Sequence, residues 1–189
     1  MRIDYVNQQI MDALVAGYPM PRYMDMNRLD ADNPLYIVTT NGFVAYVLEE
    51  NEAHFNLAHC RNEPGAFKYL TQDAALLRID NMLEPTSDVR LAAKPARKVY
   101  LDNLPIGPDR EPVLLARFKG ATWDTFINMD LLEAFDEAKY YQAQKNGPVA
   151  VVEDGALVGY VMPAKVEDAE GHYTDSPSYE NPLIEDEEE

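Results

Sequence analysis

The chain contains nearly the same strand twice, and this repeat constrains the fold more than any other feature of the sequence. Residues 43–48 read FVAYVL and residues 157–162 read LVGYVM. The first follows an apolar run and a tight-turn dipeptide, LYIVTT and NG, and the second follows VAVVE and DG. Asn-Gly and Asp-Gly favour the positive φ angles of a type I′ turn, so each copy predicts a β-hairpin.

An amphipathic helix is predicted ahead of each hairpin. In residues 6–17, VNQQIMDALVAG, apolar side chains recur at helical spacing, Asn7 is the expected N-cap and Gly17 the expected end. Residues 127–135, INMDLLEAF, align with this helix without a gap, and Asn128 is the matching cap. The sequence therefore predicts two copies of a helix–strand–turn–strand unit.

Further elements are predicted between and beside the copies. Residues 62–77 carry a helical apolar stripe after Asn and Pro, and residues 98–104 and 112–119 predict a longer hairpin joined by a Pro/Gly turn. Residues 121–127 predict a strand that leads into the second helix. We expect a pseudo-two-fold α+β domain with an antiparallel sheet over residues 1–166. Its parts are repeat 1 at about 1–50, an intervening helix and basic hairpin at about 62–120, and repeat 2 at about 121–166, followed by an acidic disordered tail at 167–189.

Charge is unevenly distributed along the chain. The 189 residues carry a net charge of −17, and residues 167–189 hold ten acids and no Lys or Arg. Residues 90–119 hold seven bases against three acids. A body this acidic repels phosphate backbones and attracts basic protein surfaces, so we expect no binding to free nucleic acid.

Composition also predicts the compartment. No stretch approaches the roughly 18–20 consecutive apolar residues of a membrane helix, and MRIDYVNQQ lacks the apolar region of a secretory signal. A single cysteine, Cys60, excludes an internal disulfide and suits a reducing compartment. We expect a cytoplasmic protein that is not bound to a membrane.

The repeated unit resembles that of DNA sliding clamps, and locally the end of the bacterial polymerase III β subunit. The likeness is carried by INMDLLEAF at 127–135 and by YVMPAKV at 160–166, within a segment from Thr122 to Val166. It implies a clamp-like fold of helices and antiparallel strands. A bacterial clamp subunit has three such domains, whereas this chain can supply one.

The helices depart from the clamp pattern in their charge. Family helices line the DNA channel with Lys and Arg, whereas residues 6–17 hold no base. The second predicted helix presents a candidate acidic surface. Its carboxylates would repel phosphate at short range, so we expect that the chain does not encircle DNA. The acidic residues are Asp130, Glu133, Asp136 and Glu137.

No motif for catalysis, cofactor binding or metal binding is present. His54, His59 and Cys60 could donate metal ligands, but the usual zinc spacings and a second ligand pair are missing. A Cys60–His59 nucleophile lacks an orienting group. No phosphate-loop, dinucleotide-binding or nucleophile-elbow signature occurs. We expect a non-enzyme without a cofactor or a metal.

Two stretches are candidates for partner binding. YPMPRYMDM, residues 18–26, combines Tyr, Met and Arg, which are favoured at protein interfaces; alternatively it is an edge strand with Met facing the core. The basic segment forms a patch, or alternatively neutralises the acidic body. The partner-binding candidates are Tyr18, Met20, Arg22, Tyr23, Met24 and Met26, and the basic patch is Arg90, Lys94, Arg97, Lys98, Arg117 and Lys119.

Three functions are compatible with these features. The first is a non-catalytic interaction protein, a monomer or homodimer, whose protein partner could belong to the DNA-handling machinery. The second is a DNA-mimic inhibitor of a nucleic-acid enzyme, of the anti-restriction or anti-CRISPR type that phages and plasmids carry; the net charge of −17 motivates it. The third is a replication processivity factor, against which the acidic helices argue.

Overall fold

The computed structural model describes residues 1–26, 34–67, 70, 79–91 and 113–164. In these residues the fold is α+β, as predicted, with one α-helix and a ten-stranded mixed sheet. None of the described helices has the length and apolarity needed to cross a membrane. The predicted tail at 167–189 lies outside the described residues. The helix is α1 (Ile3–Ala16), and the 3-10 turns are η1 (Glu50–Glu52), η2 (Leu57–His59), η3 (Pro64–Phe67) and η4 (Met129–Leu132).

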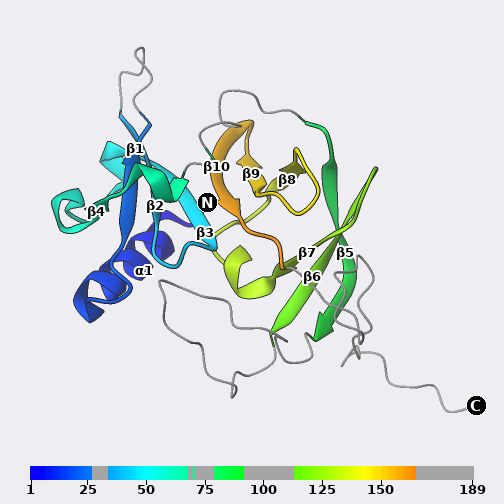
Figure 1. Ribbon diagram of the computed structural model, residues 1–189, viewed down its shortest axis with the longest axis horizontal. Coiled ribbons are helices and arrows are strands. Elements are labelled where there is room, and N and C mark those ends of the chain that lie inside the picture. The colour runs from blue at the N-terminus through cyan, green and yellow to red at the C-terminus, as the bar shows by residue number, and fades with distance from the viewer. Residues whose placement is uncertain (27–33, 68–69, 71–78, 92–112, 165–189) are drawn as a thin grey trace, which may run out of the picture.

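The strands form one sheet in the order β4-β1-β2-β3-β10-β9-β8-β5-β6-β7. Neighbouring strands are antiparallel except β1 and β4, which are parallel. Figure 1 shows α1 with β1–β3 at one end of the molecule and β5–β7 at the other. The strands are β1 (Arg22–Asp25), β2 (Leu35–Thr39), β3 (Val44–Glu49), β4 (Arg61–Asn62), β5 (Met82–Leu91), β6 (Leu114–Gly120), β7 (Thr125–Asn128), β8 (Lys139–Gln142), β9 (Val149–Glu153) and β10 (Ala156–Val161).

The two strands that share a sequence, β3 and β10, pair with each other in the middle of this order. Tyr160 lies opposite Ala45, and Gly159 lies opposite Tyr46. The pairing leaves no room for a side chain at Gly159, because a Cβ there would lie 2.6 Å from the carbonyl oxygen of Ala45 and 2.8 Å from the ring of Phe135. The absence of a side chain at residue 159 therefore lets β3, β10 and Phe135 pack closely.

Both hairpins form, but with different turns. Asp154 and Gly155 have φ values of 50° and 82° and join β9 to β10 as a two-residue loop, as a type I′ turn requires. The first hairpin is not of this type, since among residues 41 and 42 only Gly42 has a positive φ, 77°. There Asn41 Oδ1 accepts from the backbone N–H groups of Phe43 at 2.8 Å and Val44 at 3.2 Å. This side-chain turn lengthens the loop.

Helix α1 begins earlier than predicted, and the predicted cap is wrong. Asn7 is buried inside the helix, and Arg2 occupies the N-cap position without a side-chain cap. The Asn7 Nδ2 donates to the carbonyl oxygens of Ile3 at 3.0 Å and Glu52 at 2.8 Å, and its Oδ1 accepts from His54 N at 2.7 Å. The side chain serves a tertiary contact instead of a cap. Gly17, with φ 71°, ends the helix as predicted.

The predicted second helix is wrong for most of its length. Residues up to Asn128 belong to β7, and only η4 follows, with Asn128 Oδ1 capping Asp130 N at 3.1 Å. Ile127 and Asn128 pair with Ala116 and Leu115 of β6, so sheet pairing takes the start of the predicted helix. Beyond η4, Arg2 N donates to Ala134 O at 2.8 Å, and Arg2 Nη1 donates to Glu133 O at 3.1 Å.

The predicted elements between the copies are only partly described. Of the helix at 62–77 the structure gives η3, and residues 68–69 and 71–78 lie outside the described residues. The predicted strand at 98–104 also lies outside them. The strand at 114–120, β6, pairs with β5 on one side and β7 on the other, so its hairpin partner is β5, for which the sequence predicted no strand.

The main hydrophobic core joins α1 to both parts of the sheet. Val6 and Ile10 of α1 pack with Tyr46 of β3, and the same cluster reaches Phe118 and Tyr140. A second cluster lies around Met24, Ile37, Phe67 and Tyr160. The main core therefore includes residues from α1 to β10. It holds α1 in place, and the candidate site lies at the end of this helix.

Candidate functional site

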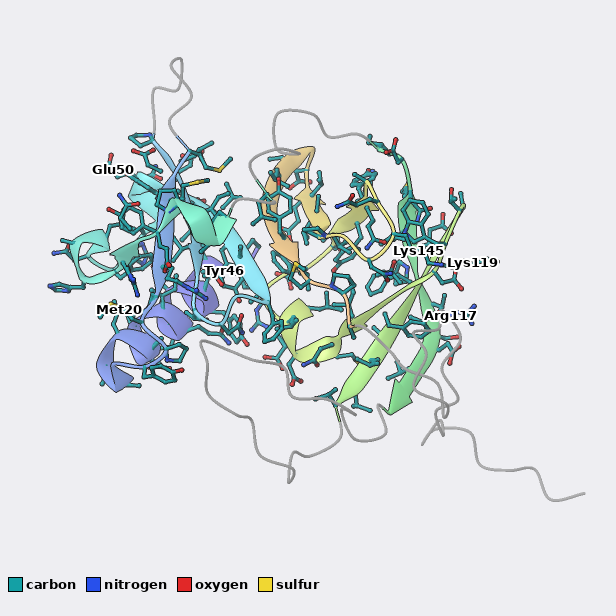
Figure 2. All side chains as sticks on the ribbon, viewed as in Figure 1. Met20, Tyr46, Glu50, Arg117, Lys119 and Lys145 are labelled. Carbon is teal, nitrogen blue, oxygen red and sulfur yellow. The ribbon has the colours of Figure 1, made fainter. Side chains whose placement is uncertain are left out.

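Three large apolar side chains lie exposed where α1 ends and the chain turns toward β1. Val15 is 89% exposed, Tyr18 53% and Met20 51%. Gly17 adopts the left-handed conformation and its N–H caps Ala13 O at 3.0 Å, which turns the chain away from the core just after Val15. We call Val15, Tyr18 and Met20 the 15–20 surface; Figure 2 shows Met20 at the outer end of the molecule beside α1.

The predicted partner-binding stretch 18–26 is divided by β1. Tyr18 and Met20 precede the strand and are exposed, whereas Met24 is buried in the second cluster and Met26 packs against it. Tyr23 is half-buried and meets Tyr36 edge-on, with ring centroids 6.3 Å apart. Of the six predicted partner-binding residues, Tyr18 and Met20 are the two that are exposed. Arg22, also half-buried, lies between the two parts.

Met24 faces the core, as the edge-strand alternative for this stretch expects, but β1 does not lie at the edge of the sheet. β1 is paired on both sides, with β2 and with the short β4. Pro21 contributes to this cover because its carbonyl accepts from Arg61 N at 2.8 Å. Met24 is buried because it packs with Ile37 and Phe67, and Pro21, directly before the strand, is buried as well.

The candidate acidic surface is exposed but is not a helix face. Asp130, Glu133, Asp136 and Glu137 lie in and after η4, and all four residues are exposed. Glu133 Oε2 accepts from Tyr5 OH at 2.6 Å, and the backbone N–H of Asp136 donates to Glu153. The Glu133 carboxylate therefore contacts the first turn of α1, and the four acidic residues do not follow a helical row.

A chain of hydrogen bonds links that acidic turn to the core. Tyr5 OH accepts from Gln9 Nε2 at 2.6 Å, and Gln9 Oε1 accepts from Tyr46 OH at 3.3 Å. Burial, followed by the hydrogen bond to Glu133, raises the pKa of Tyr5 to about 12, and burial raises that of Tyr46. Tyr46 of β3, labelled in Figure 2, also packs against Phe135, with ring centroids 6.0 Å apart. The neutral phenols hold α1 against η4.

The predicted basic patch is reduced by internal ion pairs. Arg117 of β6 is half-buried. Its Nη2 lies 2.5 Å from Asp124 Oδ2, and its Nη1 lies 3.2 Å from Asp88 Oδ2. A bulge in β5 places Asp88 there, and the hydrogen bonds to Asp124 and Asp88 raise the pKa of Arg117. Lys119 is exposed, and Arg90 lies in β5 opposite Leu115. The other patch residues, Lys94, Arg97 and Lys98, lie outside the described residues.

The described residues do not assemble the metal or nucleophile candidates. Cys60 is buried in the main core, and burial raises the pKa of its thiol to about 11, which disfavours a reactive thiolate. His54 and His59 are exposed. No group of three or more His, Cys, Asp or Glu side chains suited to a metal occurs within the described part of the chain.

Val15 is not one of the partner-binding residues predicted from the sequence. It lies in the predicted helix, directly after Leu14, which still packs against the main core. The signal was present, because Val15 falls five residues after Ile10 and so lies off the buried face, next to the Gly that ends the helix.

Searches of family models, of curated proteins and of solved structures each give no match to this chain.

Proposed function

We propose that the protein is a non-catalytic interaction protein of the cytoplasm whose clamp-like α+β domain acts through protein–protein contacts at the 15–20 surface. The observation that carries this proposal is the exposure of Val15, Tyr18 and Met20 within six residues at one end of the fold. Partners from the DNA-handling machinery are the class that the clamp resemblance favours.

Burial of these side chains would supply binding energy. Fully burying one large apolar side chain is worth about 1.5–3 kcal/mol, and Tyr in particular is favoured at interface hot spots. Because Gly17 and β1 fix the two ends of the segment, a partner would order few additional residues on binding. A pre-organised apolar surface at a chain turn is suited to a protein partner.

The clamp-like two-fold arrangement is supported by strand register. The sequence alignment equates Ala45 with Gly159 and Tyr46 with Tyr160, and a local two-fold axis would exchange the pair Ala45–Tyr160 with the pair Gly159–Tyr46. The flanking order continues this relation, because β2 and β1 follow β3 as β9 and β8 follow β10. In this proposal η4 takes the place of α1 in the second copy.

The proposal is tested by affinity capture from nuclease-treated lysate with three baits. They are the wild-type protein, a Tyr18→Ser, Met20→Ser variant, and an Ile79→Ser, Met129→Ser control that alters exposed apolar residues elsewhere. We expect the first and third baits to retain the same partner and the second to lose it. Equal capture by all three baits would contradict a role for the 15–20 surface.

A DNA-mimic inhibitor is the second candidate, and the exposure of Asp130, Glu133, Asp136 and Glu137 around one turn favours it. A mimic competes with DNA, so duplex DNA would elute its partner, and added salt would weaken binding because carboxylates stand in for phosphates. A partner that detergent elutes and DNA does not would support the apolar interface instead. A processivity factor would require a closed ring in solution.

A further inference from the structure

The outward face of α1 carries exposed side chains in a row that ends at the 15–20 surface. Residues spaced three or four apart lie on one helix face, and four such residues are exposed. Gln8 Nε2 donates to Asp12 Oδ1 at 2.7 Å, which holds that carboxylate on the row. Two acids and one amide therefore lead to an apolar end. The row is Asp4, Gln8, Asp12 and Val15.

No cation from α1 itself balances this face. The helix contains no Lys or Arg between Ile3 and Ala16, and its last turn has no basic residue. The carboxyl end of a helix carries a partial negative charge, which a nearby cation stabilises. On β4, which pairs with β1, Arg61 Nε lies 3.8 Å from Glu63 Oε2, so this base already has an acidic neighbour.

These observations identify the chemistry that would complement the face. A positive side chain would gain from Asp12 and from the helix end, and apolar side chains would gain from Val15, Tyr18 and Met20. Phosphate backbones and anionic lipid surfaces would be repelled by the same acids and by the net charge of −17. The complementary partner is a protein segment that combines basic and apolar residues.

We propose that the outer face of α1 and the 15–20 surface together bind a basic, apolar segment of a partner protein. A Lys or Arg of the segment lies beside Asp12, and its apolar side chains cover Val15, Tyr18 and Met20. This inference rests on the proposed function of the 15–20 surface as a protein interface, and it adds the chemical class of the partner.

The test measures binding of three labelled synthetic peptides to the full chain by fluorescence anisotropy. The first peptide places Lys next to Leu along one face of a helix, the second has Glu in place of each Lys, and the third has Ser in place of each Leu. We expect only the first to bind at moderate salt. Binding of the third as tightly as the first would overturn the apolar half of the proposal.

A charge reversal at Asp12 distinguishes this site from general attraction to an acidic protein. Asp12→Lys should weaken binding of the Lys peptide by about tenfold and allow binding of the Glu peptide, because the sign of the local field changes. Lys near a helix carboxyl end is favourable for folding, so the variant should remain folded. An unchanged preference for the Lys peptide would overturn the proposal.

Asp80→Lys is the matched control, since it reverses one exposed charge elsewhere in the fold. Asp80 directly precedes Asn81 and β5, and β5 lies at the end of the molecule away from α1 (Figure 1). We expect the control to change peptide affinity by less than about twofold. An effect equal to that of Asp12→Lys would mean that the net charge alone drives binding, and it would overturn the site.

The inference can fail while the proposed function stands. A lysate partner that is lost with Tyr18→Ser, Met20→Ser, combined with no binding of the Lys peptide, would show a protein interface without basic chemistry and would overturn only the inference. Binding to vesicles with anionic lipid in preference to the Lys peptide would overturn it in favour of a membrane.

Discussion

At the residue scale, Gly159 decides how closely the centre of the sheet can pack. A Cβ at this position would meet the carbonyl oxygen of Ala45 at 2.6 Å and the Phe135 ring at 2.8 Å. Neither neighbour can move freely, because Ala45 is in the sheet and Phe135 is buried in the main core. Overpacking therefore acts on backbone and core at once.

We predict that Gly159→Ala lowers the free energy of unfolding by about 1–3 kcal/mol. Urea denaturation followed by the fluorescence of Trp123 measures the change. Gly65→Ala is the control, since a Cβ at Gly65 meets nothing within 4 Å, and it should change stability by less than about 0.5 kcal/mol. Equal effects of the two substitutions would contradict the close approach at Gly159.

Gln142 is a second residue whose role is set by buried partners. Its side chain is fully buried; Oε1 accepts from Trp123 Nε1 at 2.6 Å and from Thr125 Oγ1 at 2.5 Å, and Nε2 donates to Gly147 O at 2.8 Å. Gln142→Leu leaves these groups unsatisfied, so we predict a loss of about 2–3 kcal/mol and a shifted Trp123 emission. The exposed Gln144→Leu should leave both the stability and the emission maximum unchanged.

At the scale of elements, two predictions that depend only on the conformation of one or two residues are confirmed. The Asp154–Gly155 hairpin and the end of α1 at Gly17 form as expected because positive φ angles are intrinsic to those residues. The helix predicted at 127–135 fails at its start because Ile127 and Asn128 pair with Ala116 and Leu115 of β6. No local pattern records such a partner.

The candidate site could be predicted to a similar extent. Tyr18 and Met20 were identified from composition and are exposed, whereas Met24 and Tyr23 were placed in the same stretch and are withdrawn. Met24 is buried because it packs with Ile37 and Phe67, two residues that are distant in sequence. Tertiary packing on the faces of the sheet decides which part of an apolar stretch remains available to a partner.

The attachment of α1 to η1 gives a test at this scale. Asn7 joins the helix to the carbonyl of Glu52 and to the N–H of His54, so Asn7→Ala leaves both backbone groups without their partner. We predict a loss of about 1–3 kcal/mol and faster hydrogen exchange in α1 and residues 50–54. The exposed Gln8→Ala should leave exchange in residues 50–54 unchanged; an effect equal to that of Asn7→Ala would contradict this attachment.

At the scale of the molecule, a buried thiol and buried phenols make the stability of the fold sensitive to high pH. Burial raises the pKa of the Cys60 thiol to about 11, and it raises the pKa values of Tyr46 and Tyr140. These groups lie in the one core that joins α1 to both parts of the sheet. Their neutral forms are favoured in the folded state, and the unfolded chain loses its protons at lower pH.

We predict that the free energy of unfolding falls as pH rises above about 9, the ordinary value of a thiol. Between this pH and about 11 the folded Cys60 retains a proton that the unfolded chain has lost, so unfolding releases protons and rising pH favours it. Urea titrations at a series of pH values measure the slope of the free energy of unfolding against pH, and Cys60→Ala should make this slope shallower without changing it below pH 8.

Because buried tyrosines contribute in the same direction, Tyr46→Phe should reduce the slope further at higher pH, where a phenol titrates. A slope that neither substitution alters would mean that the core does not hold these groups in their neutral forms, and would contradict the packing of α1 on β3.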